Sequence, residues 1–142
     1  MKRFLLSFFL LFPLTFLSAQ KNILFISVDD LKPMFKSYGH QDMITPNIDA
    51  LAAKGTSFLN TSTQQAICAP SRASLLTGLY PDNTRVWDLE TQIRDENPNV
   101  VTLPQHFKNN GYYSVGLGKI FDSRSVDNLS LIHISEPTRR DP

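Results

Sequence analysis

The 142-residue sequence contains a single cysteine, and it carries no excess of charge of either sign, with a formal net charge of +1. One cysteine cannot form an internal disulfide, so a disulfide-stapled scaffold is excluded. The balanced charge gives no electrostatic case for nucleic-acid binding. Internal repeats and low-complexity segments are also absent from the sequence. A chain of this length is sufficient to bury one modest hydrophobic core.

The residue pattern at the N-terminus is typical of an export signal. A basic start precedes an apolar stretch over residues 4–17, and the small residues Ser18 and Ala19 follow. This pattern predicts a signal peptide over residues 1–19 that is cleaved before Gln20. The run is too short and too interrupted by proline to favour a permanent transmembrane helix. We therefore expect an exported protein without a stable membrane anchor, periplasmic or extracellular, or lysosomal if the source is eukaryotic.

The segment from Cys68 to Gly78 has the signals of a short helix with the cysteine at its start. Pro70 suits a first helical turn, residues 71–77 continue the helix, and Gly78 supplies its C-terminal stop. A thiol at the positive end of a helix is activated. A lone cysteine is otherwise more often a small buried hydrophobe. In an oxidising compartment, however, an unpaired thiol is a liability unless chemistry uses it or burial protects it.

Two adjacent carboxylates follow the first apolar run of the mature chain. Residues 22–28 are continuously apolar apart from Asn22 and Ser27, which predicts a buried strand of a parallel sheet. Asp29 and Asp30 come next, at the carboxyl edge where open α/β sheets bind ligands. Such a pair can be a solvated turn, or it can hold a hard divalent cation such as Ca²⁺ or Mg²⁺. The residues alone leave both alternatives open.

The remaining pattern alternates helices and strands. Residues 45–55 and 102–111 each have a threonine at the N-cap, an early proline and a final glycine, which predicts two capped helices. The first should pack an apolar face, including Leu51, against a sheet. Residues 57–60 and 112–117 are expected strands. This alternation predicts an α/β protein.

Several of these segments together resemble the type I sulfatases. Cys68-Ala69-Pro70-Ser71-Arg72, continued by Leu76-Thr77-Gly78, resembles the family signature. Asp29-Asp30, the Thr-Pro-Asn-Ile-Asp run from Thr45 and Gly118-Lys119 resemble further landmarks in the family's order. The resemblance covers roughly residues 21–128 and is nearest to the iduronate-2-sulfatase-like branch. It implies an alkaline-phosphatase-like sandwich, a mostly parallel mixed sheet between helices, whose N-terminal part occupies residues 20–128.

The resemblance also implies a chemistry, the hydrolysis of sulfate esters. A formylglycine-generating or sulfatase-maturating enzyme would convert Cys68 to formylglycine, whose hydrated aldehyde would attack sulfur. Asp29, Asp30 and position 68 would bind Ca²⁺, in preference to Mg²⁺. Arg72 would act in catalysis, and Lys119 would hold the sulfate. The nearest branch further implies a 2-O-sulfate on a sulfated glycan, such as a glycosaminoglycan, as substrate.

The sequence departs from the family pattern at two places. Asp122 stands where the nearest branch has a histidine that also reaches the sulfate, so the substrate subclass stays open. Residues 129–142 do not resemble the family and are typical of translated sequencing-adapter read-through, which predicts a non-native tail. The family's remaining metal ligands and its leaving-group acid lie further downstream, so we expect the 142-residue chain to be inactive.

Two other hypotheses compete with a sulfatase. The first is a phosphonate or phosphate ester hydrolase of the same superfamily, which can share the cysteine motif. The second is a secreted, non-catalytic binding module with an unmodified thiol at Cys68 and no bound Ca²⁺.

Overall fold

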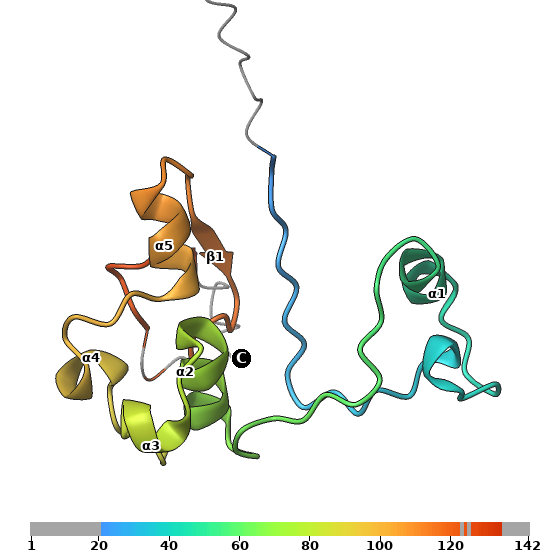
Figure 1. Ribbon diagram of the computed structural model, residues 1–142, viewed down its shortest axis with the longest axis horizontal. Coiled ribbons are helices and arrows are strands. Elements are labelled where there is room, and N and C mark those ends of the chain that lie inside the picture. The colour runs from blue at the N-terminus through green and yellow to red at the C-terminus, as the bar shows by residue number, and fades with distance from the viewer. Residues whose placement is uncertain (1–20, 123, 125, 135–142) are drawn as a thin grey trace, which may run out of the picture.

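The computed structural model describes residues 21–122, 124 and 126–134. The predicted signal peptide and residues 135–142 of the predicted tail lie outside the described residues. The described elements are the 3₁₀ helix η1 (Lys36–Tyr38), the helices α1 (Pro46–Ala52), α2 (Cys68–Thr77), α3 (Pro81–Thr84), α4 (Ile93–Glu96) and α5 (Leu103–Asn109), and the strands β1 (Val115–Leu117) and β2 (Ile132–Ile134) (Figure 1). Over the same residues, no helix combines the length and the apolar character that crossing a membrane requires.

Helix α2 lies at the centre of the larger group of elements, which also contains α3, α4, α5 and β1 (Figure 1). Its residues Ala69, Ala73 and Leu76 are spaced four and three apart, so they share one face, and all three are buried. Ala69 and Ala73 belong to one hydrophobic cluster and Leu76 to a second. The buried partners are Val86 and Ile93 in the first cluster, and Phe121 and Leu131 in the second.

The helix that carries the cysteine forms where the sequence predicted it. It starts at Cys68, and Pro70 falls within its first turn. Proline is tolerated there because the first N–H groups of a helix have no partner within the helix. The predicted stop at Gly78 is confirmed, since this residue has a φ of 72° and its N–H donates to the Ser74 carbonyl at 2.8 Å.

The two capped helices form where they were predicted, but only one has the predicted cap. Before α5, the Thr102 hydroxyl accepts a hydrogen bond from the Gln105 N–H at 3.4 Å, which confirms the N-cap. Before α1, the Thr45 hydroxyl instead donates to the Asp49 carboxylate at 3.1 Å and makes no capping bond. The predicted packing of α1 against a sheet is wrong here, because Leu51 is 70% exposed and α1 lies beside η1, apart from β1 (Figure 1).

Strand β1 pairs with β2 in parallel, with Gly116 opposite His133. This agrees with the predicted strand at 112–117, although β1 is shorter. A side chain at Gly116 would bring its Cβ within 2.9 Å of a Leu131 methyl group, so a larger residue there would force the Leu131 side chain to shift. Strand β2 belongs to the segment that we expect to be a non-native tail, and that expectation stays a prediction.

Two predicted strands do not form in the described part of the chain. Residues 22–28 run as an extended arm without strand pairing, and residues 57–60 end in a turn (Figure 1). Leu24 is 84% exposed and Ile26 is 71% exposed, so the predicted burial of the first strand is also wrong here. A continuous apolar run is buried only where neighbouring strands pair with it and helices cover it. Within the described residues, no strand lies beside this arm.

Truncation of Leu76 should destabilise the fold much more than truncation of its neighbour in α2. Leu76 is 2% exposed and Leu75 is 51% exposed. We expect Leu76→Ala to lower the free energy of unfolding by about 2–4 kcal/mol, because it removes buried methyl groups and leaves a cavity. Leu75→Ala should change it by less than about 1 kcal/mol. Urea denaturation followed by circular dichroism measures both values, and equal losses would contradict the central position of α2.

Candidate active site

A cleft of about 410 Å³ lies at the start of α2 and contains four of the five predicted site residues in its walls. These residues are Asp29, Asp30, Cys68 and Arg72. The extended arm supplies the two carboxylates, and α2 supplies the cysteine and the arginine (Figure 1). The fifth residue, Lys119, lies in the loop after β1 and reaches the same place with its side chain. The structure therefore brings all five predicted residues together.

Arg72 ties the three segments of the site to one another. One terminal nitrogen of its guanidinium donates to the Asp29 carboxylate at 2.8 Å. The other donates to the Ser27 hydroxyl at 3.3 Å, to the Ile120 carbonyl at 3.0 Å and to the Lys119 carbonyl. The Arg72 side chain is only 7% exposed, so these contacts are made largely away from water. A planar guanidinium offers five N–H donors in a fixed arrangement, which suits this set of acceptors.

Lys119 lies between the cysteine and two carboxylates. Its ammonium nitrogen is 2.6 Å from Asp29 Oδ2, 3.3 Å from Cys68 Sγ and 3.9 Å from Asp122 Oδ2. The hydrogen bond to Asp29 is the main cause of a raised pKa at Lys119. Reciprocally, the hydrogen bonds from Lys119 and then Arg72 lower the pKa of Asp29. Both groups are therefore charged at neutral pH.

Asp29, Asp30 and Cys68 form the one group of acidic, histidine or cysteine side chains in the described residues that is arranged to hold a metal ion. Their ligand atoms lie within 4.8 Å of one another. Calcium binds oxygen ligands at about 2.4 Å, so two ligands of one ion are separated by at most about 4.8 Å. The two carboxylates therefore fit Ca²⁺ in both chemistry and spacing. A thiol is a soft ligand that Ca²⁺ does not favour, so position 68 fits only when it presents oxygen.

Comparison with known proteins identifies the family. The sequence profile of the sulfatase family matches residues 21–125. The chain belongs to the sulfatase family. It is 49% identical over 100 residues to iduronate 2-sulfatase of Mus musculus and 48% identical over 100 residues to iduronate 2-sulfatase of Homo sapiens, in each case over 70% of this chain and 18% of the relative. It is also 40% identical over 104 residues to an ulvan-active sulfatase of Formosa agariphila, over 72% of this chain and 20% of the relative.

The predicted membership of the sulfatases, with a resemblance to iduronate 2-sulfatase, is thus confirmed. The chain spans about a fifth of the length of these curated relatives. Membership of the sulfatase family implies the predicted alkaline-phosphatase-like α/β fold. The described residues contain helices around α2 and the two-stranded parallel sheet of β1 and β2, and they include no larger sheet.

Two side chains that contribute to this site, those of Ser27 and Arg124, were not predicted from the sequence. Ser27, a partner of Arg72, lay within the apolar run predicted to be a buried strand and gave no separate signal. Arg124 donates to both oxygens of Asp122, at 2.6 Å and 2.9 Å, and this pairing lowers the pKa of Asp122. Asp122 was noticed only as a departure from the family pattern, yet it is 1% exposed and lies beside Lys119. An acidic residue two positions before an arginine is too common a pattern to predict this pair.

Replacement of Arg72 by lysine should loosen the site and lower the stability of the chain. A lysine ammonium cannot reach the Asp29 carboxylate and the carbonyl groups at once, and a partly buried carbonyl would lose its donor. We expect Arg72→Lys to lower the free energy of unfolding by about 2–3 kcal/mol. Arg85→Lys is the matched control, because Arg85 is exposed and should tolerate the change. Urea denaturation compares the two, and an unchanged value for Arg72→Lys would show that these contacts contribute little.

Proposed function

We propose that this sulfatase-family protein hydrolyses sulfate esters, with position 68 supplying the nucleophile after conversion of Cys68 to formylglycine. The observation that carries the proposal is the position of Cys68. Its sulfur lies 3.3 Å from the Lys119 ammonium and close to both carboxylates of the candidate metal site. A nucleophile for a sulfate monoester must work beside cations, because the substrate is an anion with negative charge on its outer oxygens.

Two groups that the family uses would complete this chemistry. Formylglycine supplies a hydrated aldehyde whose oxygen is nucleophilic, and it also gives position 68 the oxygen that the metal site needs. Asp29, Asp30 and position 68 would hold Ca²⁺, which would supply Lewis acidity toward the sulfate oxygens. The lowered pKa of Asp29 keeps one of these carboxylates ionised and ready to bind the cation.

The side chains of this chain divide the remaining work. Lys119 binds a sulfate oxygen as a point charge, and its contact with Asp29 fixes the ammonium beside position 68. Arg72 contributes to catalysis through its contacts, because it orients the Asp29 carboxylate and holds the backbone of the Lys119 loop. Asp122, paired with Arg124, lies 3.9 Å from the Lys119 ammonium and attracts it weakly as a second carboxylate. In this proposal, all of these side chains act at the place where the sulfate group binds.

We further propose a sulfated glycan as the substrate, with a 2-O-sulfate as the group removed. The identity of 49% to a protein named iduronate 2-sulfatase supports this class, and so does the 40% identity to an ulvan-active sulfatase. The protein would be exported, to the periplasm or the extracellular space, and would depend on a formylglycine-generating or sulfatase-maturating enzyme. We propose that the 142-residue chain alone is inactive.

The modification at Cys68 is directly measurable by mass spectrometry. Trypsin cleaves after Lys54 and after Arg72, so residues 55–72, which include Cys68, form one tryptic peptide. In protein expressed in its native host, we expect this peptide to be about 18 Da lighter than its cysteine form, because thiol oxidation to the aldehyde creates the nucleophile. Cys68→Ala should show no such loss. An intact, alkylatable thiol in a host that matures other sulfatases would favour the binding-module hypothesis instead.

The reaction class and the metal are tested together by hydrolysis rates. We expect protein purified from its native host to hydrolyse an aryl sulfate faster than the matching aryl phosphonate, and chelation of divalent cations to abolish this activity until Ca²⁺ is restored. Asp30→Asn should lower kcat/KM by at least about a hundredfold. Asp42→Asn, a substitution at an exposed aspartate outside the cleft, should leave it unchanged.

A faster rate on the phosphonate would support the other hydrolase class of the superfamily. Sulfate release that survives chelation would exclude the proposed metal role. Metal-dependent sulfate release by the 142-residue chain would overturn the proposal that it is inactive.

A further inference from the structure

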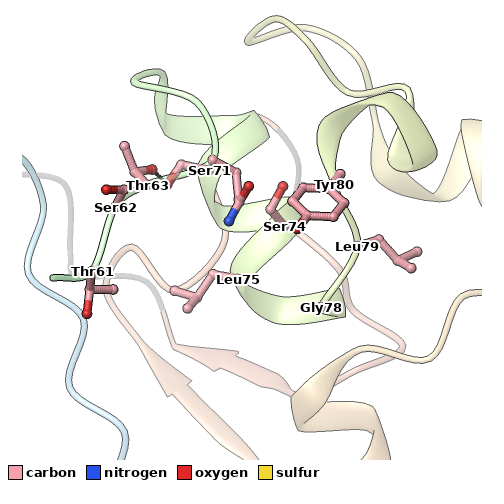
Figure 2. Close-up of a pocket in the computed structure, with 10 residues that line it drawn as sticks. Thr61, Ser62, Thr63, Ser71, Ser74, Leu75, Gly78, Leu79 and Tyr80 are labelled. Carbon is pink, nitrogen blue, oxygen red and sulfur yellow. Dashed lines mark hydrogen bonds between the residues drawn. The ribbon is translucent and has the colours of Figure 1, made fainter. Parts of the chain in front are cut away.

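A second cleft adjoins the candidate active site and lies along α2 from Ser71 toward Gly78. Its volume is about 490 Å³, and it lies between α2, the segment before α2 and the residues that follow the helix (Figure 2). Thr63, Ser71 and Leu75 line both clefts. The hydroxyl groups of Thr63 and Ser71 are hydrogen-bonded at 2.8 Å, so a polar bridge marks the boundary between the two. A molecule of more than one ring could therefore extend from one cleft into the other.

The chemistry of the second cleft differs from that of the active site. The active site presents carboxylates and cations, whereas the described lining of the second cleft includes no aspartate, glutamate, lysine, arginine or histidine. It presents instead one amide side chain and six hydroxyl groups, which belong to Thr61, Ser62, Thr63, Ser71, Ser74 and Tyr80. These groups donate and accept hydrogen bonds without carrying charge. The cleft is therefore suited to a neutral, hydroxyl-rich ligand rather than to an anion.

Ser74 provides the most direct sign of a ligand. The residue is 5% exposed, and its hydroxyl oxygen has no hydrogen-bond partner among the described residues. The hydroxyl of Thr77 in the same helix, in contrast, donates to the Ala73 carbonyl. A buried hydroxyl without a partner is costly, and a bound group that supplies a partner would remove this cost. In Figure 2 the Ser74 side chain extends from α2 toward the side of the helix where Tyr80 is drawn.

Tyr80 supplies an apolar surface at the same cleft. The residue is 65% exposed, follows the glycine that ends α2, and lines the cleft together with Leu79. An aromatic ring with a polar tip can stack against an apolar ligand face while its hydroxyl stays in water. A sugar ring has such a face of C–H groups and a rim of hydroxyl groups. An exposed ring beside a set of hydroxyl groups therefore fits a carbohydrate better than a wholly apolar ligand.

We infer that this second cleft is a subsite for an uncharged sugar residue next to the sulfated sugar of the substrate. The inference rests on the proposed function, because it places the sulfated sugar in the cleft of Cys68 and Lys119. It adds a determinant of specificity, because Ser74 and Tyr80 would select substrates by the sugar unit that is linked to the sulfated sugar. A site built to hydrogen-bond a hydroxyl group discriminates strongly against ligands that lack it.

The test measures binding of a neutral disaccharide, N,N′-diacetylchitobiose, to the 142-residue chain by ligand-observed NMR. We expect Ser74→Ala to weaken binding about fivefold, because one hydrogen bond is lost. Tyr80→Ala should weaken it about tenfold, whereas Tyr80→Phe, which keeps the ring, should bind nearly as well as the parent. Tyr113→Ala is the matched control, because Tyr113 is 81% exposed and does not line the cleft. Circular dichroism of each variant establishes that it is folded.

A second probe, inorganic sulfate, separates this inference from the proposed function. Lys119→Ala should weaken sulfate binding at least about fivefold and leave binding of the disaccharide unchanged. Disaccharide binding that depends on Ser74 and Tyr80, in a chain that retains its thiol at Cys68 although it was expressed in a host that matures other sulfatases, would support the subsite and count against the proposed catalytic function. Sulfate binding that depends on Lys119, without any binding of the disaccharide, would overturn the subsite alone. Equal disaccharide affinities for the parent, Ser74→Ala and Tyr80→Ala would also overturn it.

Discussion

The site depends on the bonding of one guanidinium group. Arg72 is fixed on the buried face of α2, and its nitrogens contact Asp29 and Ser27 of the N-terminal arm and two carbonyl groups of the loop after β1. The arm makes no strand pairing in the described residues, so these contacts, together with the pair of Lys119 and Asp29, hold the Asp29 carboxylate beside the helix. Because a guanidinium stays charged at every physiological pH, this attachment does not loosen when the surroundings are acidified moderately. The metal-binding and anion-binding parts of the site thus share one anchor.

The charges of the site are balanced before any ligand binds. Asp29 is paired with Arg72 at 2.8 Å and with Lys119 at 2.6 Å, and Asp122 is paired with Arg124. Asp30 lies beside this network in a left-handed conformation with a φ of 49°, which an aspartate tolerates better than most residues. These three acids and three bases together carry no formal net charge. A divalent cation and a sulfate group can then bind together with little accumulation of charge, because each compensates the other.

Local signals in the sequence predicted local structure well. The glycine after α2 and the threonine before α5 were both identified, because a left-handed stop and a side-chain cap depend only on neighbouring residues. The five site residues were also identified, but from the family resemblance, since the spacing of residues 29, 68 and 119 says nothing of their contact. The strand predicted at 22–28 failed because its formation depends on distant partners. Ser27, Arg124 and Ser74 could not be predicted, as their roles arise only from tertiary contacts.

The separation of the site residues along the chain has a consequence for the order of folding. The pair of Asp29 and Lys119 is 90 positions apart, and the pair of Cys68 and Lys119 is 51 positions apart. Closing loops of this length costs conformational entropy that only the completed contacts repay, so such contacts form late. Helix α2 has local hydrogen bonds and can form much earlier. During synthesis, the cysteine segment is therefore complete and accessible well before its lysine and carboxylate partners enclose it, which leaves a kinetic window for chemical modification of the thiol.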